Sequence, residues 1–293
     1  MRQVCILGAG GQLGQELQRR CPAGVSLHAI DRVAADLTQP AQIRAVLERL
    51  QPDIIINAAA YTAVDRAESE PELAHAVNAG APRVLAEWAQ GHAARLLQVS
   101  TDFVFDGSQG RPYTPADPIA PLGVYGASKA AGEENIRNTL GETALILRTA
   151  WVYSQFGNNF VKTMLRLMAE RESLSVVGDQ IGTPTWAGGL AAALWRAVEQ
   201  PEFTGTQHWT DAGVASWYDF AVAIQEEGLQ HGLLARQIPI QMIPATAYPT
   251  PAQRPACAVL DKTGSYAALG AAPHWRVQLR QMMSEWQEGI HNG

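Results

Sequence analysis

A glycine-rich turn near the N-terminus constrains the fold of this chain more than any other feature. Residues 4–7 are an apolar run, and the turn Gly8-Ala9-Gly10-Gly11-Gln12-Leu13-Gly14 leads from it into a helical pattern. A strand, a glycine-rich turn and a helix in this order are the context that a dinucleotide fingerprint requires. The glycines allow a tight turn and the close approach of a pyrophosphate, which then lies on the helix's N-terminal amides. We therefore predict a dinucleotide site that includes Gly8, Gly11, Gln12, Leu13 and Gly14.

The second predicted strand, residues 26–30, bears on the choice of cofactor. It ends at Asp31 and Arg32, and Asp36 and Leu37 follow closely. An acidic residue at this point holds the ribose hydroxyls of the adenosine, whereas an arginine accommodates a 2′-phosphate. We assign all four residues to the cofactor site and leave NADH and NADPH open, since both charged types are present. A turn carboxylate and a solvated arginine are the alternative.

Strands and helices keep alternating through the first half of the chain. Residues 53–57 form a third apolar strand that leads into Ala58, Ala59 and Ala60. Their small side chains would let the backbone approach a cofactor, or would simply pack against a helix. Pro71 opens a helix that we expect to continue through Ala89. The alternation predicts an α/β fold with a doubly wound parallel sheet, a Rossmann fold.

Tyr125 and Lys129 form the chemical centre of the sequence. Four residues apart, they lie on one face of a predicted helix, and we expect the ammonium to lower the pKa of Tyr125 toward neutrality. Thr101 and Asp102 end an apolar strand, at the sheet edge where ligands bind. We predict that Thr101, Tyr125 and Lys129 are catalytic, with Thr101 bonded to a substrate oxygen that Tyr125 protonates. A chance helical pair is the alternative, because Tyr-x-x-x-Lys alone is a weak motif.

Beyond Arg148 the alternation becomes irregular. We expect an NAD(P)-binding Rossmann domain at residues 1–150 and a smaller, mainly substrate-binding lobe at residues 151–293, with segments that return to the sheet. Trp151 is a candidate platform for a sugar ring, or an ordinary core tryptophan. Asn159 caps a predicted helix or hydrogen-bonds a nucleotide-sugar. Arg254, in a proline-rich loop, suits a diphosphate, with a solvated or salt-bridged arginine as the alternative.

Composition and charge exclude several classes of protein. The net charge of −6 argues against a nucleic-acid-binding surface. The three cysteines are scattered and the seven histidines dispersed, so we predict neither a disulfide framework nor a metal site. The N-terminus leads straight into a strand and no long apolar run follows. We therefore expect no signal peptide, no membrane span and a cytoplasmic location.

The order of these motifs resembles the extended short-chain dehydrogenase/reductase superfamily. The motifs are the glycine-rich turn, Asn57-Ala58-Ala59, Ser100-Thr101-Asp102 and Tyr125-x-x-x-Lys129. Longer segments resemble dTDP-4-dehydrorhamnose reductases, and that resemblance runs from Gln3 to about Glu285. These segments are residues 58–70 (AAAYTAVDRAESE), 100–107 (STDFVFDG), 148–153 (RTAWVY), 157–160 (GNNF) and 248–255 (YPTPAQRP).

The resemblance implies an NAD(P)H-dependent reduction at carbon 4 of a keto-sugar attached to thymidine diphosphate, the last step of dTDP-L-rhamnose synthesis. Tyr125 would protonate the developing alkoxide. Lys129 would hold the nicotinamide ribose, so both residues also belong to the cofactor site. Thr101 stands where most of the superfamily has serine, and a hydroxyl is all that the oxygen contact needs. The implied substrate site consists of Thr62, Val64, Asp65, Thr101, Asp102, Trp151, Asn159 and Arg254.

Two positions depart from the family pattern. Phe103 stands where many relatives carry tyrosine. Some relatives bind magnesium through glutamates at a dimer interface, and Glu16 matches one such position, but residues 187–190 offer no carboxylate. That argues against a metal, while the resemblance allows a homodimer. The competing functions are a non-catalytic regulatory subunit, as in methionine adenosyltransferase, and a reductase or epimerase of another nucleotide-sugar.

Overall fold

The computed structural model describes residues 1–291 and contains a six-stranded sheet in the order β10-β5-β4-β3-β1-β2. Every neighbouring pair of strands is parallel. The strands are β1 (Arg2–Leu7), β2 (Val25–Ile30), β3 (Ile54–Asn57), β4 (Arg95–Thr101), β5 (Leu145–Thr149) and β10 (Gly205–His208). The chain proceeds from β1 to one side and then, from β3, to the other. This confirms the predicted doubly wound sheet, and it puts the strand-order reversal between β1 and β3, where such sheets bind ligands.

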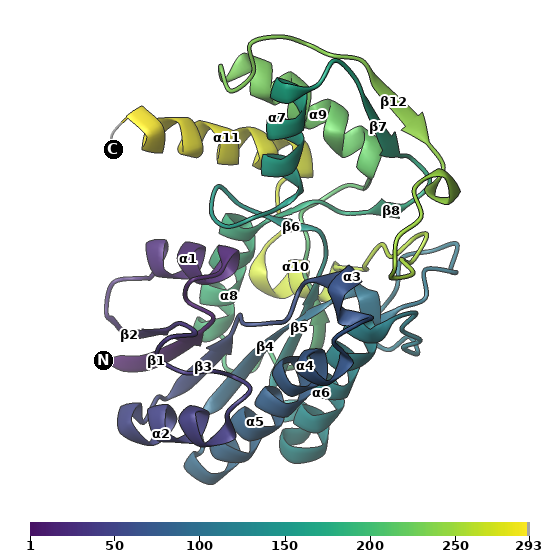
Figure 1. The fold of residues 1–293 in the computed structure, drawn as a ribbon. Coiled ribbons are helices and arrows are strands. Elements are labelled where there is room, and N and C mark those ends of the chain that lie inside the picture. The colour runs from purple at the N-terminus through teal and green to yellow at the C-terminus, as the bar shows by residue number, and fades with distance from the viewer. Residues whose placement is uncertain (292–293) are drawn as a thin grey trace.

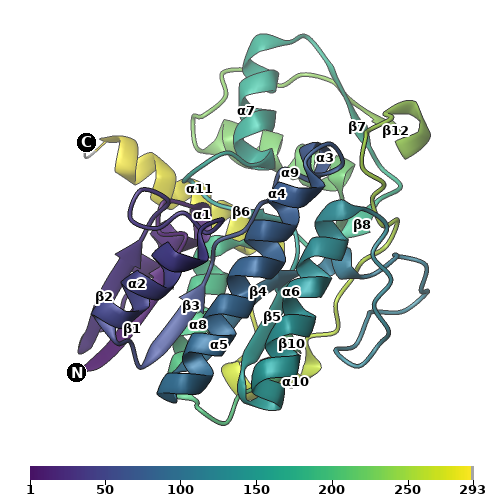
Figure 2. The same ribbon diagram turned by 60° about the horizontal axis from the view of Figure 1, so that its bottom comes forward.

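Helices cover both faces of the sheet (Figures 1 and 2). Strand residues alternate between the two faces: Val4 and Ile6 join one hydrophobic cluster, Cys5 and Leu7 the other. The first face packs against α1 (Gln12–Arg19), α8 (Ala187–Glu199) and α10 (Thr263–Leu269). The second packs against α2 (Pro40–Leu50), α5 (Ala81–His92) and α6 (Val124–Leu140). The inner strands are therefore buried on both sides, as apolar runs such as residues 54–56 require, whereas the edge strands β2 and β10 are mostly half-buried.

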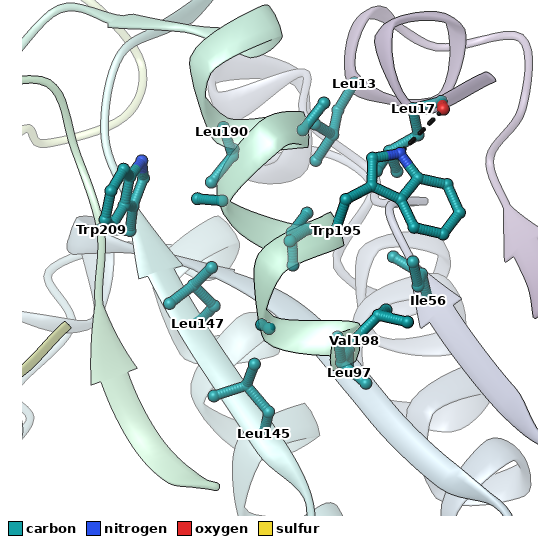
Figure 3. Packing of buried hydrophobic residues seen from close by; sticks show 14 of the residues in the cluster. Leu13, Leu17, Ile56, Leu97, Leu145, Leu147, Leu190, Trp195, Val198 and Trp209 are labelled. Atoms are coloured by element: carbon teal, nitrogen blue, oxygen red, sulfur yellow. Dashed lines mark hydrogen bonds between the residues drawn. The ribbon is translucent and has the colours of Figure 1, made fainter. Parts of the chain in front are cut away.

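Helix α8 comes from the second half of the chain and returns to the first sheet. Figure 3 shows Trp195 and Val198 of this helix between α1 and the strands. The indole N–H of Trp195 donates to the carbonyl of Leu17 at 3.0 Å. Strand β10 also returns, pairing with β5. Residues beyond 150 thus complete the sheet that the N-terminal half begins.

The helix expected from Pro71 through Ala89 contains a π-helical turn. The chain forms α3 (Val64–Ala67), α4 (Pro71–His75), a π-helical turn η1 (Ala76–Gly80) and then α5. Asn78 in this turn accepts a bond from the Tyr61 amide at 2.8 Å and donates to Ser128 Oγ of α6 at 3.0 Å. The expected helix is therefore present, and the π turn within it places Asn78 between the loop after β3 and α6, a use typical of π bulges near functional sites.

A second lobe lies above the carboxyl ends of the sheet strands in Figure 1. Its hydrophobic cluster joins α7 (Phe160–Glu170), α9 (Trp217–Gln230) and α11 (Trp275–His291) with the parallel pair β7 (Leu174–Val177) and β12 (Ile240–Ile243). Short strands connect the two parts: β6 (Val152–Tyr153) with β9 (Thr185–Trp186), and β8 (Ile181–Gly182) with β11 (Ala215–Ser216). The remaining helical turns are η2 (Asp102–Val104), η3 (Gly141–Thr143) and η4 (Ala245–Ala247). None of the helices in the described part of the chain has the length and apolar character of a membrane span.

Candidate active site

The glycine-rich turn packs too closely against its neighbours to carry side chains at two positions. Gly8 has φ +83°, and a Cβ there would lie 2.7 Å from the backbone of Ala59. A Cβ on Gly14 would lie 2.1 Å from the carbonyl oxygen of Gly8. No side chain caps α1 at Gly11, so its first amides point toward the turn without a side-chain acceptor. The turn therefore fits a pyrophosphate, as the sequence predicts.

The acidic residues after β2 stabilise turns by accepting hydrogen bonds from nearby backbone amides. Asp31 Oδ1 accepts bonds from the amides of Val33 at 3.0 Å and Ala34 at 2.9 Å. Asp36 accepts from the amide and the hydroxyl of Thr38, which lowers the pKa of Asp36. The turn role considered for Asp31 is thus confirmed. Its role toward a ribose, and those of Arg32, Asp36 and Leu37, stay predictions.

The loop after β3 is fixed from both sides. Asn57 is buried, donates to Gln98 Oε1 at 2.8 Å and accepts a bond from the Ala59 amide at 3.2 Å. Ala58, Ala59 and Ala60 follow in this loop, and Ala59 lies directly beside Gly8. Farther along, Thr62 is exposed and Val64 is half-buried.

The predicted catalytic residues come together at the carboxyl end of β4. Thr101 is the last residue of that strand, and Tyr125 and Lys129 lie on the first turns of α6. Tyr125 forms a hydrogen bond with Thr101. The Lys129 ammonium is buried and donates to the carbonyl of Val99 at 2.7 Å. The ring of Phe103 meets Tyr125 edge-on with 5.4 Å between centroids, so the hydrophobic contact does not depend on the missing hydroxyl.

The expected effect of Lys129 on Tyr125 is wrong for this structure. Burial raises the pKa of Tyr125 to about 12, the bond with Thr101 acts against this shift, and the charge of Asp102 adds to it. Burial also lowers the pKa of Lys129 to about 8. The ammonium is directed to a backbone carbonyl rather than to the phenol. A phenol that stays protonated at neutral pH is nevertheless the form that donates a proton.

A buried ion pair that the sequence analysis missed supports this group. Arg148 donates to both carboxylate oxygens of Glu133, at 2.9 and 2.7 Å, and Ser100 Oγ donates to Glu133 at 2.6 Å. Burial alone would raise the pKa of Glu133, but these bonds and the charge of Arg148 hold it below its usual value. Glu133 is one helical turn beyond Lys129, and that i, i+4 spacing is the sequence signal that could have revealed it.

Two residues predicted separately for the substrate contact each other. Arg254 forms a bidentate pair with Asp65, with Nη1–Oδ1 at 3.0 Å and Nη2–Oδ2 at 2.7 Å. The bond from Arg254 is the main cause that lowers the pKa of Asp65. Arg254 also donates to Thr250 Oγ1 at 2.6 Å. The salt-bridged alternative for Arg254 is therefore present in the structure.

Trp151 and Asn159 are also engaged within the chain. Trp151 has φ +44° and stacks on Trp217, with centroids 3.5 Å apart and planes 5° apart. One face of the Trp151 indole is thus covered by a tryptophan that the sequence analysis did not name. Asn159 accepts from the Lys162 amide at 3.1 Å and so caps α7, which confirms the capping alternative. Its amide donates to Gln12 Oε1 at 2.9 Å, which links the lobe to the glycine-rich turn.

Glu16, the position considered for magnesium, is engaged within the chain. Glu16 is fully buried, accepts a bond from Ser154 Oγ at 2.9 Å and lies 3.5 Å from Arg20 Nε. Burial raises the pKa of this carboxyl group. In residues 1–291 no cluster of three or more His, Cys, Asp or Glu side chains is arranged to hold a metal ion. Glu16 therefore acts in packing between α1 and the segment after β6.

The fold and the grouping of a threonine, a tyrosine and a lysine at the edge of the sheet define the class of extended short-chain dehydrogenases/reductases. The UDP-glucose 4-epimerase of Thermus thermophilus, solved with NAD, has this fold, with a TM-score of 0.82 at 18% identity over 97% of this chain and 99% of that chain.

Closer similarities narrow the class to one family. The family model described as the RmlD substrate binding domain matches residues 1–288. The dTDP-4-dehydrorhamnose reductase of Escherichia coli (strain K12) is 40% identical over 96% of this chain and 97% of that protein. A dTDP-4-dehydrorhamnose reductase structure from Bacillus anthracis, in complex with NADP, has a TM-score of 0.90 and 34% identity and covers 97% of this chain and 100% of that chain. This chain belongs to the dTDP-4-dehydrorhamnose reductase family.

Proposed function

We propose that this chain reduces the carbon-4 keto group of dTDP-4-dehydro-L-rhamnose with NADPH or NADH and so forms dTDP-L-rhamnose. The observation that carries the proposal is the convergence of Thr101, Tyr125 and Lys129 at the end of β4 in a chain of this family. A dTDP-linked sugar is the substrate class that the names of the relatives support.

The residues of this chain would hold the keto oxygen and protonate it. A bound nicotinamide would supply the hydride to carbon 4. Tyr125, protonated at neutral pH because burial raises its pKa to about 12, gives its phenolic proton to the oxygen as negative charge develops there. Thr101 orients the same oxygen. Lys129, one helical turn farther along α6, would hold the nicotinamide ribose.

The rest of the proposed site follows the layout of the two parts of the chain. The glycine-rich turn, residues 31–37 and residues 58–60 take the cofactor. The nucleotide-sugar is bound by seven residues: Thr62, Val64, Asp65, Asp102, Trp151, Asn159 and Arg254. The division at residue 150 is supported by the separate hydrophobic cluster of the lobe, although α8 and β10 return to the sheet. The homodimer stays a prediction, which sedimentation equilibrium tests.

The experiment is the oxidation of NADPH and of NADH in the presence of dTDP-4-dehydro-L-rhamnose, with dTDP-glucose as a control that has no keto group. We expect substrate-dependent oxidation, and the two rates rank the cofactors. Nucleotide binding without oxidation would instead favour the regulatory subunit. Oxidation only with a different keto nucleotide-sugar would keep the reductase and change its substrate.

A further inference from the structure

Asp102 is a buried carboxyl group beside the catalytic residues, and one of its oxygens has no partner. Its side chain is only 2% exposed. Oδ1 accepts the hydroxyl proton of Thr101 at 3.0 Å, whereas Oδ2 is buried with no hydrogen-bond partner. A buried carboxylate oxygen without a donor is costly, because water no longer solvates its charge. A group retained in this state next to the reacting atoms calls for a functional explanation.

The surroundings of Asp102 favour its neutral form. Burial raises its pKa to about 7, although Thr101 and the amides of Asp102 and Phe103 act in the opposite direction. Among the described residues no lysine or arginine forms an ion pair with it. From α6 it meets Tyr125, which is neutral at pH 7, while the ammonium of Lys129 is bonded to Val99.

The ionisable groups farther along the same helix and strands leave Asp102 uncompensated. Glu133 on α6 is paired with Arg148. His208, which meets the ring of Phe105 edge-on, is neutral because burial and Arg148 lower its pKa to about 4. Asp102 therefore has no counter-charge and changes its own charge near neutral pH.

The Thr101 hydroxyl connects this charge to the reaction, because it has a single proton to donate. When Asp102 is a carboxylate, that proton is held by Oδ1. The Thr101 oxygen then offers only lone pairs, one of which accepts from the Phe103 amide at 3.2 Å. When Asp102 is neutral, the charge that holds the proton is gone. The hydroxyl can then rotate and donate to an oxygen bound in front of Tyr125.

We propose that Asp102 is a positioning residue for the reaction: its carboxyl group sets the direction of the Thr101 hydroxyl proton, and only the neutral acid leaves that proton to the keto oxygen of the substrate. The inference rests on the proposed function, since it requires a keto oxygen that Thr101 and Tyr125 share. Asp102 exerts this role through its bond to Thr101, in addition to the contact with the nucleotide-sugar proposed for it above.

The first test compares kcat of the wild type and of Asp102→Asn across the pH range. A carboxamide does not ionise, so the ratio of wild-type to variant kcat should fall about tenfold between about pH 6 and pH 8. Titration of Lys129 affects both enzymes and cancels in the ratio. The matched control is Asp211→Asn, which changes another buried aspartate whose pKa burial raises to about 7, bonded to the Trp186 amide. Its ratio to the wild type should not change with pH.

Two further measurements make the outcome decisive. In a Thr101→Ala background, the Asp102→Asn substitution should no longer alter the pH profile; a persisting effect means that Asp102 acts without Thr101 and overturns the inference. Infrared difference spectra of wild type against Asp102→Asn, without substrate, should show a protonated-carboxyl band that disappears as the pH rises past about 7. A band absent throughout overturns the inference as well.

Failure of this inference is distinguishable from failure of the proposed function. A wild type that turns over substrate with a pH-independent ratio contradicts only the role of Asp102. A wild type that does not turn over substrate at any pH contradicts the proposed reductase and, with it, the role of Asp102.

Discussion

At the scale of single residues, two tyrosine hydroxyls have opposite surroundings. The hydroxyl of Tyr125 is bonded to Thr101 in the site, whereas that of Tyr153 is buried with no partner. Tyr125→Phe removes the proton donor, so we expect kcat to fall about 10²- to 10⁴-fold while the dissociation constant of NADPH stays within about twofold. Turnover and fluorescence titration measure the two effects.

Tyr153→Phe is the matched control for this substitution. It deletes a buried hydroxyl that makes no hydrogen bond, so activity should be unchanged and stability unchanged or slightly higher. Normal turnover of Tyr125→Phe would remove Tyr125 from the role of acid.

Arg254 is the second residue whose role can be isolated. We expect Arg254→Ala to raise the KM for the nucleotide-sugar about 10- to 100-fold, with kcat little changed, because charge-assisted bonds to the diphosphate are lost. Arg236→Ala is the control, since Arg236 also forms a bidentate pair, with Glu172 at 2.8 Å for both bonds, on the outer surface of the lobe. An unchanged KM for Arg254→Ala would leave Arg254 a structural partner of Asp65.

The pairing of Asp65 with Arg254 also shows what a sequence cannot give at this scale. Each residue was predicted to bind substrate from a separate sequence motif. The two are 189 positions apart, and only the packing of the loop at 248–255 against α3 brings them together. The pKa of Tyr125 escaped prediction for the same reason. The spacing to Lys129 was right, whereas the direction of the ammonium depends on the carbonyl of Val99.

At the scale of elements, the β1–α1 unit was predictable because its geometry is local. A glycine is required where the helix meets the turn, and Gly14 meets this need. We expect Gly14→Ala to lower the free energy of unfolding by about 1–3 kcal/mol and to weaken NADPH binding, because its Cβ would lie 2.1 Å from the Gly8 carbonyl oxygen. Urea unfolding and nucleotide titration measure both effects.

Gly10→Ala provides the comparison within the same turn. A Cβ at Gly10 meets nothing within 4 Å and its φ is not positive, so stability and binding should both persist. Equal losses in the two variants would mean that the turn tolerates no added side chain anywhere, and the close contact at Gly14 would not be the cause.

The π-helical turn around Asn78 is the element that the sequence did not reveal. Its residues have ordinary helix-forming patterns, and the extra residue in the turn is stabilised by contacts outside it. These are the bonds of Asn78 to the Tyr61 backbone and to Ser128, and the close packing of Gly132, whose Cβ would lie 2.1 Å from the Asn78 carbonyl oxygen. Tertiary packing therefore overrides the local helical preference.

At the scale of the whole molecule, the parallel sheet was predicted from its apolar strands, but the way in which the lobe is joined to it was not. Asp211 follows β10, accepts a bond from the Trp186 amide of β9 at 2.9 Å and faces Gln278 of α11. Three segments distant in sequence thus meet at one buried carboxyl group, and nothing in the local sequence around Asp211 indicates its partners.

The titration of Asp211 should make the stability of the molecule depend on pH. Burial raises its pKa from 3.8 to about 7, so the folded state binds its proton more tightly than the unfolded state. The resulting stability is fully present below about pH 4 and is lost as the pH rises through about 7. The carboxamide of Asp211→Asn does not ionise, so the stability of this variant does not fall in this way. Its free energy of unfolding relative to the wild type should therefore rise with pH across this window, by up to about 1.4 kcal/mol per pH unit. Urea unfolding at a series of pH values measures this slope.

Asp117→Asn is the control: the ion pair with Arg111 lowers the pKa of Asp117, so its difference from the wild type should stay constant over the same window. A constant difference for Asp211→Asn would mean that Asp211 is ionised in the folded protein, and the junction between the lobe and the sheet would then have to stabilise a buried charge.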